Sequence, residues 1–127
     1  MFGEENMYGQ SEQIVDSKQR IFLPVSTKRE EGDNLALIQD KDFDIYRIYK
    51  IEKVDELFDK ISNKLSNSKT ESELKKYKKE LYDLSKTILK TIKVDKMGRV
   101  SLGESFVGIS KVNIIGAKNH IILELRK

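Results

Sequence analysis

In the centre of the chain, apolar residues recur every three or four positions, as they do along one face of an α-helix. One set comprises Ile51, Val54, Leu57, Phe58, Ile61 and Leu65, and a second comprises Leu74, Tyr77, Leu81, Leu84, Ile88 and Ile92. Thr70 and Glu73 fit a capping box for the second helix, which follows a loop at residues 66–69. This pattern predicts a helical hairpin. We expect its apolar faces to pack inside the chain, because two short β units need a partner that buries their faces.

The two ends of the chain repeat one pattern of short apolar stretches. Residues 14–24 read IVDSKQRIFLP and residues 93–103 read KVDKMGRVSLG, so Asp16 and Asp95 are 79 positions apart, as are Arg20 and Arg99. Further on the offset becomes 77, where residues 35–38 match 112–115 and residues 44–48 match 121–125. The repeat indicates two copies of one structural unit around the helical centre.

Each copy reads as short strands joined by turns. Val and Ile flank D-x-x-x-R, in which the Asp side chain can bond to its own backbone and form a turn. Gly98 permits a positive φ in the second turn, and Gln19 holds that place in the first. Pro24 closes the strand of the first copy. Hairpins are expected with strands near 34–39 and 43–49, and near 111–115 and 120–125.

These patterns predict an α+β protein in which two pseudo-repeated β units flank an αα-hairpin. We expect one domain over residues 1–127, with internal repeats at about 12–50 and 91–127 and a helical insert at about 51–90.

Composition excludes several kinds of site. The 127 residues include no Cys and one His, so a disulfide, a thiolate nucleophile, a Cys-based zinc site and a multi-His cluster are all excluded. No run of 18 apolar residues exists, so a membrane class does not fit. We therefore expect a cytoplasmic protein that binds rather than catalyses: not an enzyme, with no cofactor and no small-molecule substrate.

The formal net charge of +3 conceals an uneven distribution. Residues 1–59 carry a net charge of −6, residues 60–93 carry +6 and residues 94–127 carry +3. The Lys-rich centre is compatible with a solvated helix face or with an anionic partner.

The doubled V-D-x-x-x-R-[IV]-x-L resembles the signature of AbrB-type swapped-hairpin DNA-binding proteins. Two copies around a helical pair resemble the MraZ family, as does the opening Met1-Phe2-Gly3-Glu4. Residues 115–121 resemble its second hairpin, and Lys28-Arg29-Glu30 stands where the family has a short basic helix. The resemblance implies a fold of the double-psi or swapped-hairpin type, with Asp16, Asp95 and Gly98 as structural residues of the motif.

The resemblance also implies a function. It implies a bacterial transcriptional regulator of the division and cell-wall gene cluster, a nucleoid-associated repressor or activator. Its partners would be double-stranded DNA at repeated promoter sites and further copies of itself in a ring-like homo-oligomer. An oligomer multiplies a few DNA contacts into useful avidity.

Arg20 is the first candidate for a DNA contact, through phosphate or through guanine O6 and N7. Three basic neighbours, Lys18, Lys28 and Arg29, would hold phosphates. Arg99 and Lys96 are the corresponding candidates in the second copy, which has fewer basic neighbours. Three interpretations stay open: Arg20 contacts DNA, Arg20 only locks the turn through an ion pair with Asp16, or Asp16 orients Arg20 toward DNA.

Other features indicate packing rather than chemistry. His120 is expected to be a packed or exposed side chain. Asp40, Asp42 and Asp44 are expected on a solvated hairpin edge rather than around calcium. Tyr46 and Tyr49 are expected in packing contacts. The alternative function is a protein-interaction or scaffold protein of the same fold without DNA binding, an interpretation motivated by the acidic first half and by Gln19.

Overall fold

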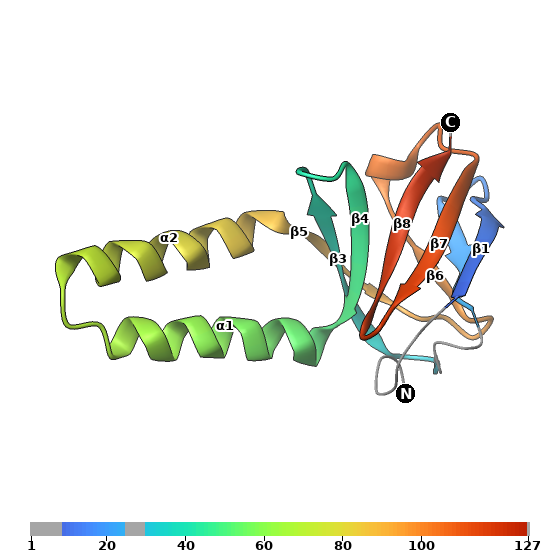
Figure 1. Ribbon diagram of the computed structural model, residues 1–127. Helices are drawn as coiled ribbons and strands as arrows, with labels where there is room; N and C mark the ends of the chain where they lie inside the picture. The colour runs from blue at the N-terminus through green and yellow to red at the C-terminus, as the bar shows by residue number, and fades with distance from the viewer. Residues whose placement is uncertain (1–8, 25–29, 127) are drawn as a thin grey trace.

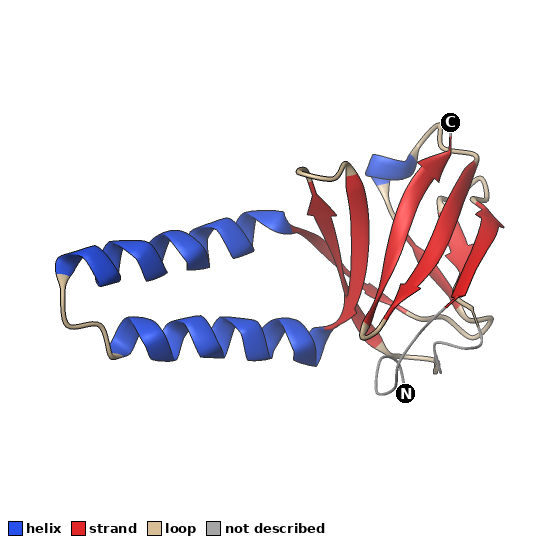
Figure 2. Ribbon diagram, in the orientation of Figure 1, coloured by secondary structure: helices blue, strands red, loops and turns tan. Residues whose placement is uncertain are grey.

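A computed structural model describes residues 9–24 and 30–126 as an α+β fold. Figures 1 and 2 show a β body from which two helices project. In chain order the elements are β1 (Gly9–Ile14), β2 (Arg20–Phe22), β3 (Asn34–Asp40), β4 (Ile45–Lys50), α1 (Ile51–Ser66), α2 (Glu71–Thr87), β5 (Ile88–Lys93), β6 (Arg99–Ser101), the 3₁₀-helix η2 (Glu104–Phe106), β7 (Lys111–Ala117) and β8 (His120–Arg126). The predicted α+β class is confirmed.

The strands pair mostly between distant parts of the sequence. Six of them form an antiparallel sheet in the order β1-β7-β8-β4-β3-β5. The edge strand β1 pairs with β7, and the other edge strand, β5, pairs with β3. In the middle, β4 pairs with β8, so that Tyr46 lies opposite Leu123. The remaining two strands, β2 and β6, form a separate ribbon in which Ile21 lies opposite Val100.

Both predicted hairpins are present, with small changes at their ends. The strand expected at 43–49 is β4, which begins at Ile45 because Asp44 adopts a left-handed conformation (φ 54°) and closes the turn. The second hairpin is tighter than the sequence indicated. Its ladder continues through Gly116 opposite Ile121 and Ala117 opposite His120, which leaves a turn of two residues.

One main hydrophobic core lies between the sheet and the β2–β6 ribbon. It contains buried side chains from both ends of the chain: Val15, Ile21, Leu23, Leu35, Leu37, Tyr46, Ile48, Ile92, Val94, Val100, Leu102, Phe106, Val112, Ile114, Ile121 and Leu123. Phe106 is fully buried, with its ring centroid 4.7 Å from that of Tyr46. The two β-rich ends therefore bury each other's apolar faces.

The second helix is shorter than its apolar spacing predicts. It ends at Thr87, and Ile88 already has extended geometry (φ −80°, ψ 112°). Ile88 and Ile92, predicted on the helix face, instead belong to β5, so the helical insert ends before residue 90. A four-residue spacing fits a strand as well as a helix, because residues two and four apart share one face of a strand.

The expected packing of the helices onto the β units is wrong for most of their length. Within α1 only Val54 is buried, and α2 has no buried residue. A small second cluster at the helix base joins Val54 to Ala36 and Ile38, with Phe58 packed against it. The two helices form a stalk that extends away from the β body (Figure 1). Neither helix is long and apolar enough to cross a membrane.

The start of α2 agrees with the predicted capping box. Thr70 has extended geometry, and its Oγ1 accepts a hydrogen bond of 3.1 Å from the backbone N–H of Glu73. This bond satisfies one of the free N–H groups at the helix start.

Candidate nucleic-acid interface

The first D-x-x-x-R motif is a tight turn organised by one carboxylate. Asp16 Oδ1 accepts hydrogen bonds of 2.9 Å from the backbone N–H groups of Lys18 and Arg20. The backbone of Asp16 exchanges two further bonds with Gln19 and Arg20. Gln19 has a φ of 58°, a left-handed conformation at the position that Gly98 holds in the second copy. The turn therefore needs Asp16 for its shape, whatever else the motif does.

The second motif repeats this arrangement. Asp95 Oδ1 accepts hydrogen bonds from the backbone N–H groups of Met97, at 2.9 Å, and Arg99, at 2.8 Å. Gly98 has a φ of 79° and stands where Gln19 stands in the first turn. Asp95 and Gly98 thus shape the second turn as Asp16 and Gln19 shape the first.

In both turns the Asp side chain also holds the Arg side chain. Arg20 Nε donates to Asp16 Oδ2 at 2.7 Å, and Arg99 Nε donates to Asp95 Oδ2 at 2.9 Å. Among the described residues, no hydrogen bond occupies the Nη1 and Nη2 groups of Arg20 or Arg99. The ion pair thus fixes one edge of each guanidinium and leaves the far end available.

Both carboxylates are stabilised in the ionised form. Hydrogen bonds from the backbone and side chain of Arg20 hold the pKa of Asp16 below its ordinary value. Desolvation by itself would raise the pKa of Asp95, but the hydrogen bonds from Arg99 outweigh it and the pKa is lowered. Each Asp–Arg pair is therefore intact at neutral pH.

The two turns meet on the β2–β6 ribbon. Ile21 and Val100 point into the core, so their neighbours Arg20, Phe22, Arg99 and Ser101 form the opposite side, here called the ribbon face. Phe22 is 45% exposed and lies opposite Arg99, whose guanidinium carbon is 5.8 Å from the ring centroid. The ribbon face thus combines two arginines with one exposed aromatic ring.

The lysines of the two motifs occupy opposite ends of the ribbon. The ladder extends past the strands through Leu102 N–H to Gln19 O, at 2.8 Å, and Leu23 N–H to Gly98 O, at 2.9 Å. The first turn, with exposed Lys18, therefore lies beside the end of β6, and the second turn, with exposed Lys96, lies beside the end of β2. Lys28 and Arg29 lie outside the described residues.

Two exposed apolar residues beside the arginines were not predicted as part of the site. Phe22 lies on the ribbon face, and Met97, in the second turn, is 59% exposed. The alternation Arg20-Ile21-Phe22-Leu23 carries the signal for Phe22, because a strand with Ile21 buried directs Phe22 outward.

A second polar cluster joins the two hairpins away from the ribbon. Arg47 donates to Asp40 Oδ2 from Nε, at 3.1 Å, and to His120 Nε2 from Nη1, at 2.8 Å. Because Arg can only donate, His120 is neutral at Nε2 and its Nδ1–H donates to Asn119 Oδ1 at 3.0 Å. The His120 ring stacks on Tyr49 with centroids 4.5 Å apart. This cluster locks the two hairpins together.

The cluster corrects one sequence expectation and agrees with others. Asp42 and Asp44 are exposed as predicted, whereas Asp40 is partly buried against Arg47. Tyr46 and Tyr49 make packing contacts, in agreement with their prediction. Desolvation, assisted by the charge of Arg47, lowers the pKa of His120, and desolvation raises the pKa of Tyr49.

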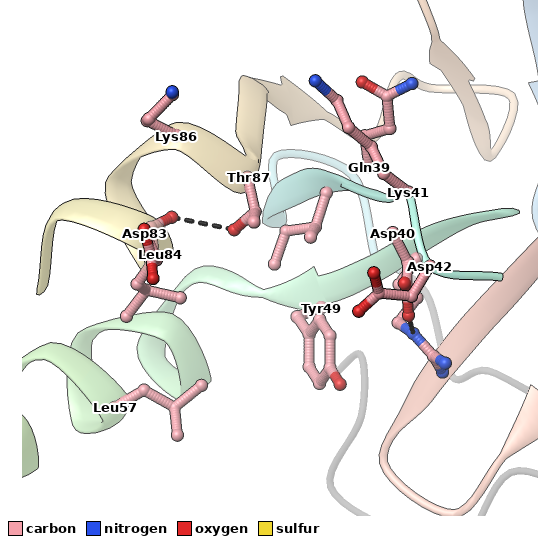
Figure 3. Close-up of a pocket in the computed structure, with 12 residues that line it drawn as sticks. Gln39, Asp40, Lys41, Asp42, Tyr49, Leu57, Asp83, Leu84, Lys86 and Thr87 are labelled. Carbon is pink, nitrogen blue, oxygen red and sulfur yellow. Dashed lines mark hydrogen bonds and ion pairs between the residues drawn. The ribbon is translucent and has the colours of Figure 1, made fainter. Parts of the chain in front are cut away.

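A cleft of about 620 Å³ lies between the tip of the β3–β4 hairpin and the base of the stalk (Figure 3). Ile38, Tyr49, Leu57 and Leu84 supply apolar lining, and three Asp, two Lys and Arg47 also line the cleft. Since both signs of charge surround it, its electrostatics favour neither an anion nor a cation.

No protein-family model matches this chain, and no curated protein matches it either.

Proposed function

We propose that this protein is a sequence-specific DNA-binding transcriptional regulator similar to AbrB and MraZ proteins, and that its ribbon face enters the major groove. The observation that carries the proposal is the pairing of two identically built D-x-x-x-R turns on one ribbon, with both arginines on the side opposite the core. A two-stranded β-ribbon fits the width of the major groove of B-DNA.

The strand pairing supports a swapped-hairpin organisation of two related units. The motif strands β2 and β6 pair with each other, and Ile21 and Val100, which are equivalent in the repeat, lie opposite one another. The same holds for Tyr46 and Leu123 in the sheet. Exchanging β1 with β5, β3 with β7 and β4 with β8 reproduces the strand order from the other end. Such an arrangement gives the two arginines equivalent places on one surface.

In this proposal the carboxylates orient the arginines that contact DNA. Asp16 holds the Nε edge of Arg20, so the Nη1–Nη2 end faces phosphate or the O6 and N7 atoms of guanine. Arg99 acts in the same way through Asp95. Phe22, which lies opposite Arg99 and two residues along β2 from Arg20, contacts the methyl group of thymine, the apolar feature of the groove.

Lys18 and Lys96 then hold phosphates on either side of the ribbon. So few contacts give one chain weak affinity, and we propose that a homo-oligomer, built as a ring, supplies avidity at repeated promoter sites. The proposed target is the bacterial division and cell-wall gene cluster, with nucleoid association as the consequence.

The test is DNA binding by single variants at the ribbon. We expect Arg20→Ala to abolish gel-shift binding to promoter DNA, or to weaken it at least tenfold, while circular dichroism stays unchanged. Each lost phosphate contact should also reduce the slope of log affinity against log salt by about 0.9. Lys118→Ala, which removes one positive charge from the exposed β7–β8 turn, is the matched control and should bind normally. A folded Arg20→Ala protein with unchanged affinity refutes the role of Arg20.

Asp16→Asn separates orientation from direct contact. Asn keeps the Oδ1 acceptor of the turn but offers an NH₂ group where Asp16 accepts from Arg20 Nε. If Asp16 orients Arg20, this variant loses part of the DNA affinity and retains the fold. Full affinity in a folded Asp16→Asn protein contradicts the orienting role.

A protein-interaction function is the second candidate. The exposed apolar pair Phe22 and Met97 favours it, because apolar and aromatic side chains are typical of the centre of protein interfaces. Salt titration separates the two functions: DNA binding weakens steeply with salt, whereas a protein-binding module has no DNA affinity to titrate.

A further inference from the structure

The stalk exposes two long helix faces that have opposite charge. The α2 outer face comprises Lys75, Lys79, Tyr82 and Lys86, which follow each other at spacings of four, three and four residues along one side of the helix. On α1, the side turned away from the apolar stripe carries Glu52, Asp55, Glu56 and Asp59.

The positive charges of the α2 outer face are largely uncompensated. Lys79 Nζ lies 3.6 Å from Asp83, in an exposed pair that contributes little. Within the described residues, Lys75 and Lys86 form no ion pair. Lys86 Nζ is 5.1 Å from the ring centroid of Tyr82, which is 61% exposed. Figure 3 shows Lys86 at the rim of the cleft, pointing away from Leu84 and Leu57.

We propose that the α2 outer face binds the sugar–phosphate backbone of duplex DNA as a second contact region; this inference rests on the proposed DNA-binding function. Lys75 to Lys86 spans about 16 Å along the helix axis. Duplex DNA offers about one phosphate charge per 1.7 Å of its axis, so three lysines in a row meet a continuous anionic surface. The contact is electrostatic and independent of sequence.

The chemistry of the face favours DNA over other partners. Protein interfaces have an apolar core, and this face has Tyr82 as its single aromatic side chain between lysines. A membrane-bound helix inserts an apolar face, but the apolar residues of α2 belong to the side that packs against α1. The acidic side of α1 repels DNA, so only the α2 side of the stalk can approach the backbone.

The stalk contact lies apart from the ribbon. The helix α2 continues into β5 at one edge of the sheet, while β1 forms the other edge. In Figure 1 the stalk leaves the β body on the side away from β1 and β6. The stalk therefore adds affinity for DNA without altering which bases the ribbon reads.

Two triple variants with equal charge change test the proposal. Lys75→Gln/Lys79→Gln/Lys86→Gln removes the three charges of the α2 outer face. Lys53→Gln/Lys60→Gln/Lys64→Gln removes the same charge from α1, and Gln preserves helix propensity in both. Binding to a fluorescent duplex is measured by anisotropy at several salt concentrations, with circular dichroism and sedimentation as checks. We expect the α2 variant to lose about tenfold or more in affinity near 0.1 M salt and to reduce the salt slope by about two to three, and the α1 variant to change much less.

Every other outcome contradicts either the proposed stalk contact or the proposed ribbon contact with DNA. Equal losses in both triple variants, or no loss in the α2 variant, overturn the stalk contact. If the α2 variant changes the sedimenting mass but not DNA affinity, the face serves self-association and the proposal is wrong. If Arg20→Ala/Arg99→Ala binds normally while the α2 variant loses affinity, the ribbon proposal fails and the stalk contact stands. If no variant or parent chain binds duplex DNA, both fail.

Discussion

Replacing the whole stalk with a short linker should leave the β body folded. The stalk interrupts the chain between Lys50, which lies opposite Leu35, and Ile88, which lies opposite Ile38. Since β4 and β5 flank β3, these two residues are separated by about two strand spacings across the sheet and three residues along it, roughly 14 Å in all. A Gly/Ser linker of about six residues spans that distance.

The expected cost is small because the stalk buries little of itself. Val54 is its one fully buried side chain, worth about 1.5–3 kcal/mol. The partly buried Ile51 and Phe58 add roughly 1 kcal/mol each. Shortening the connection between β4 and β5 recovers about 1.5 kcal/mol of loop-closure entropy. The net loss of about 2–3.5 kcal/mol lies below the total stability of about 5–15 kcal/mol that is typical of domains.

Urea unfolding followed by circular dichroism measures this cost. The shortened chain should lose helical signal, keep a β spectrum and unfold in one cooperative transition at lower urea. Val54→Ala in the full chain is the reference and should cost about 2 kcal/mol. A shortened chain without a cooperative transition would refute the reasoning that the two β-rich ends bury each other without help from the helices.

Three further outcomes follow from particular contacts. Phe106→Ala should destabilise the fold by about 3–5 kcal/mol in urea titrations, because the fully buried ring packs on Tyr46; a cost below 1 kcal/mol would contradict its place in the core. Thr70→Ala should cost about 1 kcal/mol by removing the helix cap, measured as a lower melting temperature, whereas Thr70→Ser should be close to neutral. Stability should fall as the pH drops from about 7 through 6.5 and below, because the pKa of His120 is lowered in the folded chain and the unfolded chain therefore takes up the proton first. His120→Gln should flatten this pH dependence of the unfolding free energy. An unchanged pH profile in that variant would exclude His120 as the source.

The turns of the motif could be predicted because their chemistry is local. Asp16 and Asp95 bond to backbone N–H groups two and four residues on, within the motif itself. Gly98 permits a left-handed conformation before Arg99, and the repeat places Gln19 at the same position before Arg20. The helix cap at Thr70 is equally local. In each case, a few adjacent residues contain both partners of the stabilising contact.

The features that sequence reasoning missed depend on distant partners. Ile88 and Ile92 continued a helical spacing, but pairing with Ile38 and Leu35 of β3 makes them a strand. The resemblance implied swapped hairpins, but no local pattern in the residues indicates that each edge strand pairs with the hairpin of the other end. That exchange lets the β-rich ends bury each other, which is why the helices were wrongly expected to cover them.

The same limit applies to the candidate site. Arg20 was found because it belongs to a repeated motif. The Arg47–His120 hydrogen bond joins β4 to the start of β8, and no local pattern links residues so far apart in sequence. The charged faces of the two helices could not be recognised as exposed surfaces from the sequence, because it did not show that the helices project from the β body.

The cross-pairing of the strands has a consequence for synthesis on the ribosome. Gly9 pairs with Gly116 and Ile21 with Val100, so β1 and β2 leave the ribosome long before their partners exist. The nascent first half must carry unpaired strand edges and an open apolar face until translation is nearly complete. Pairing between such distant segments makes folding slow, and aggregation or chaperone binding competes with it during that interval. A ribosome slowed anywhere between β4 and β8 would therefore prolong this exposure and lower the yield of native protein.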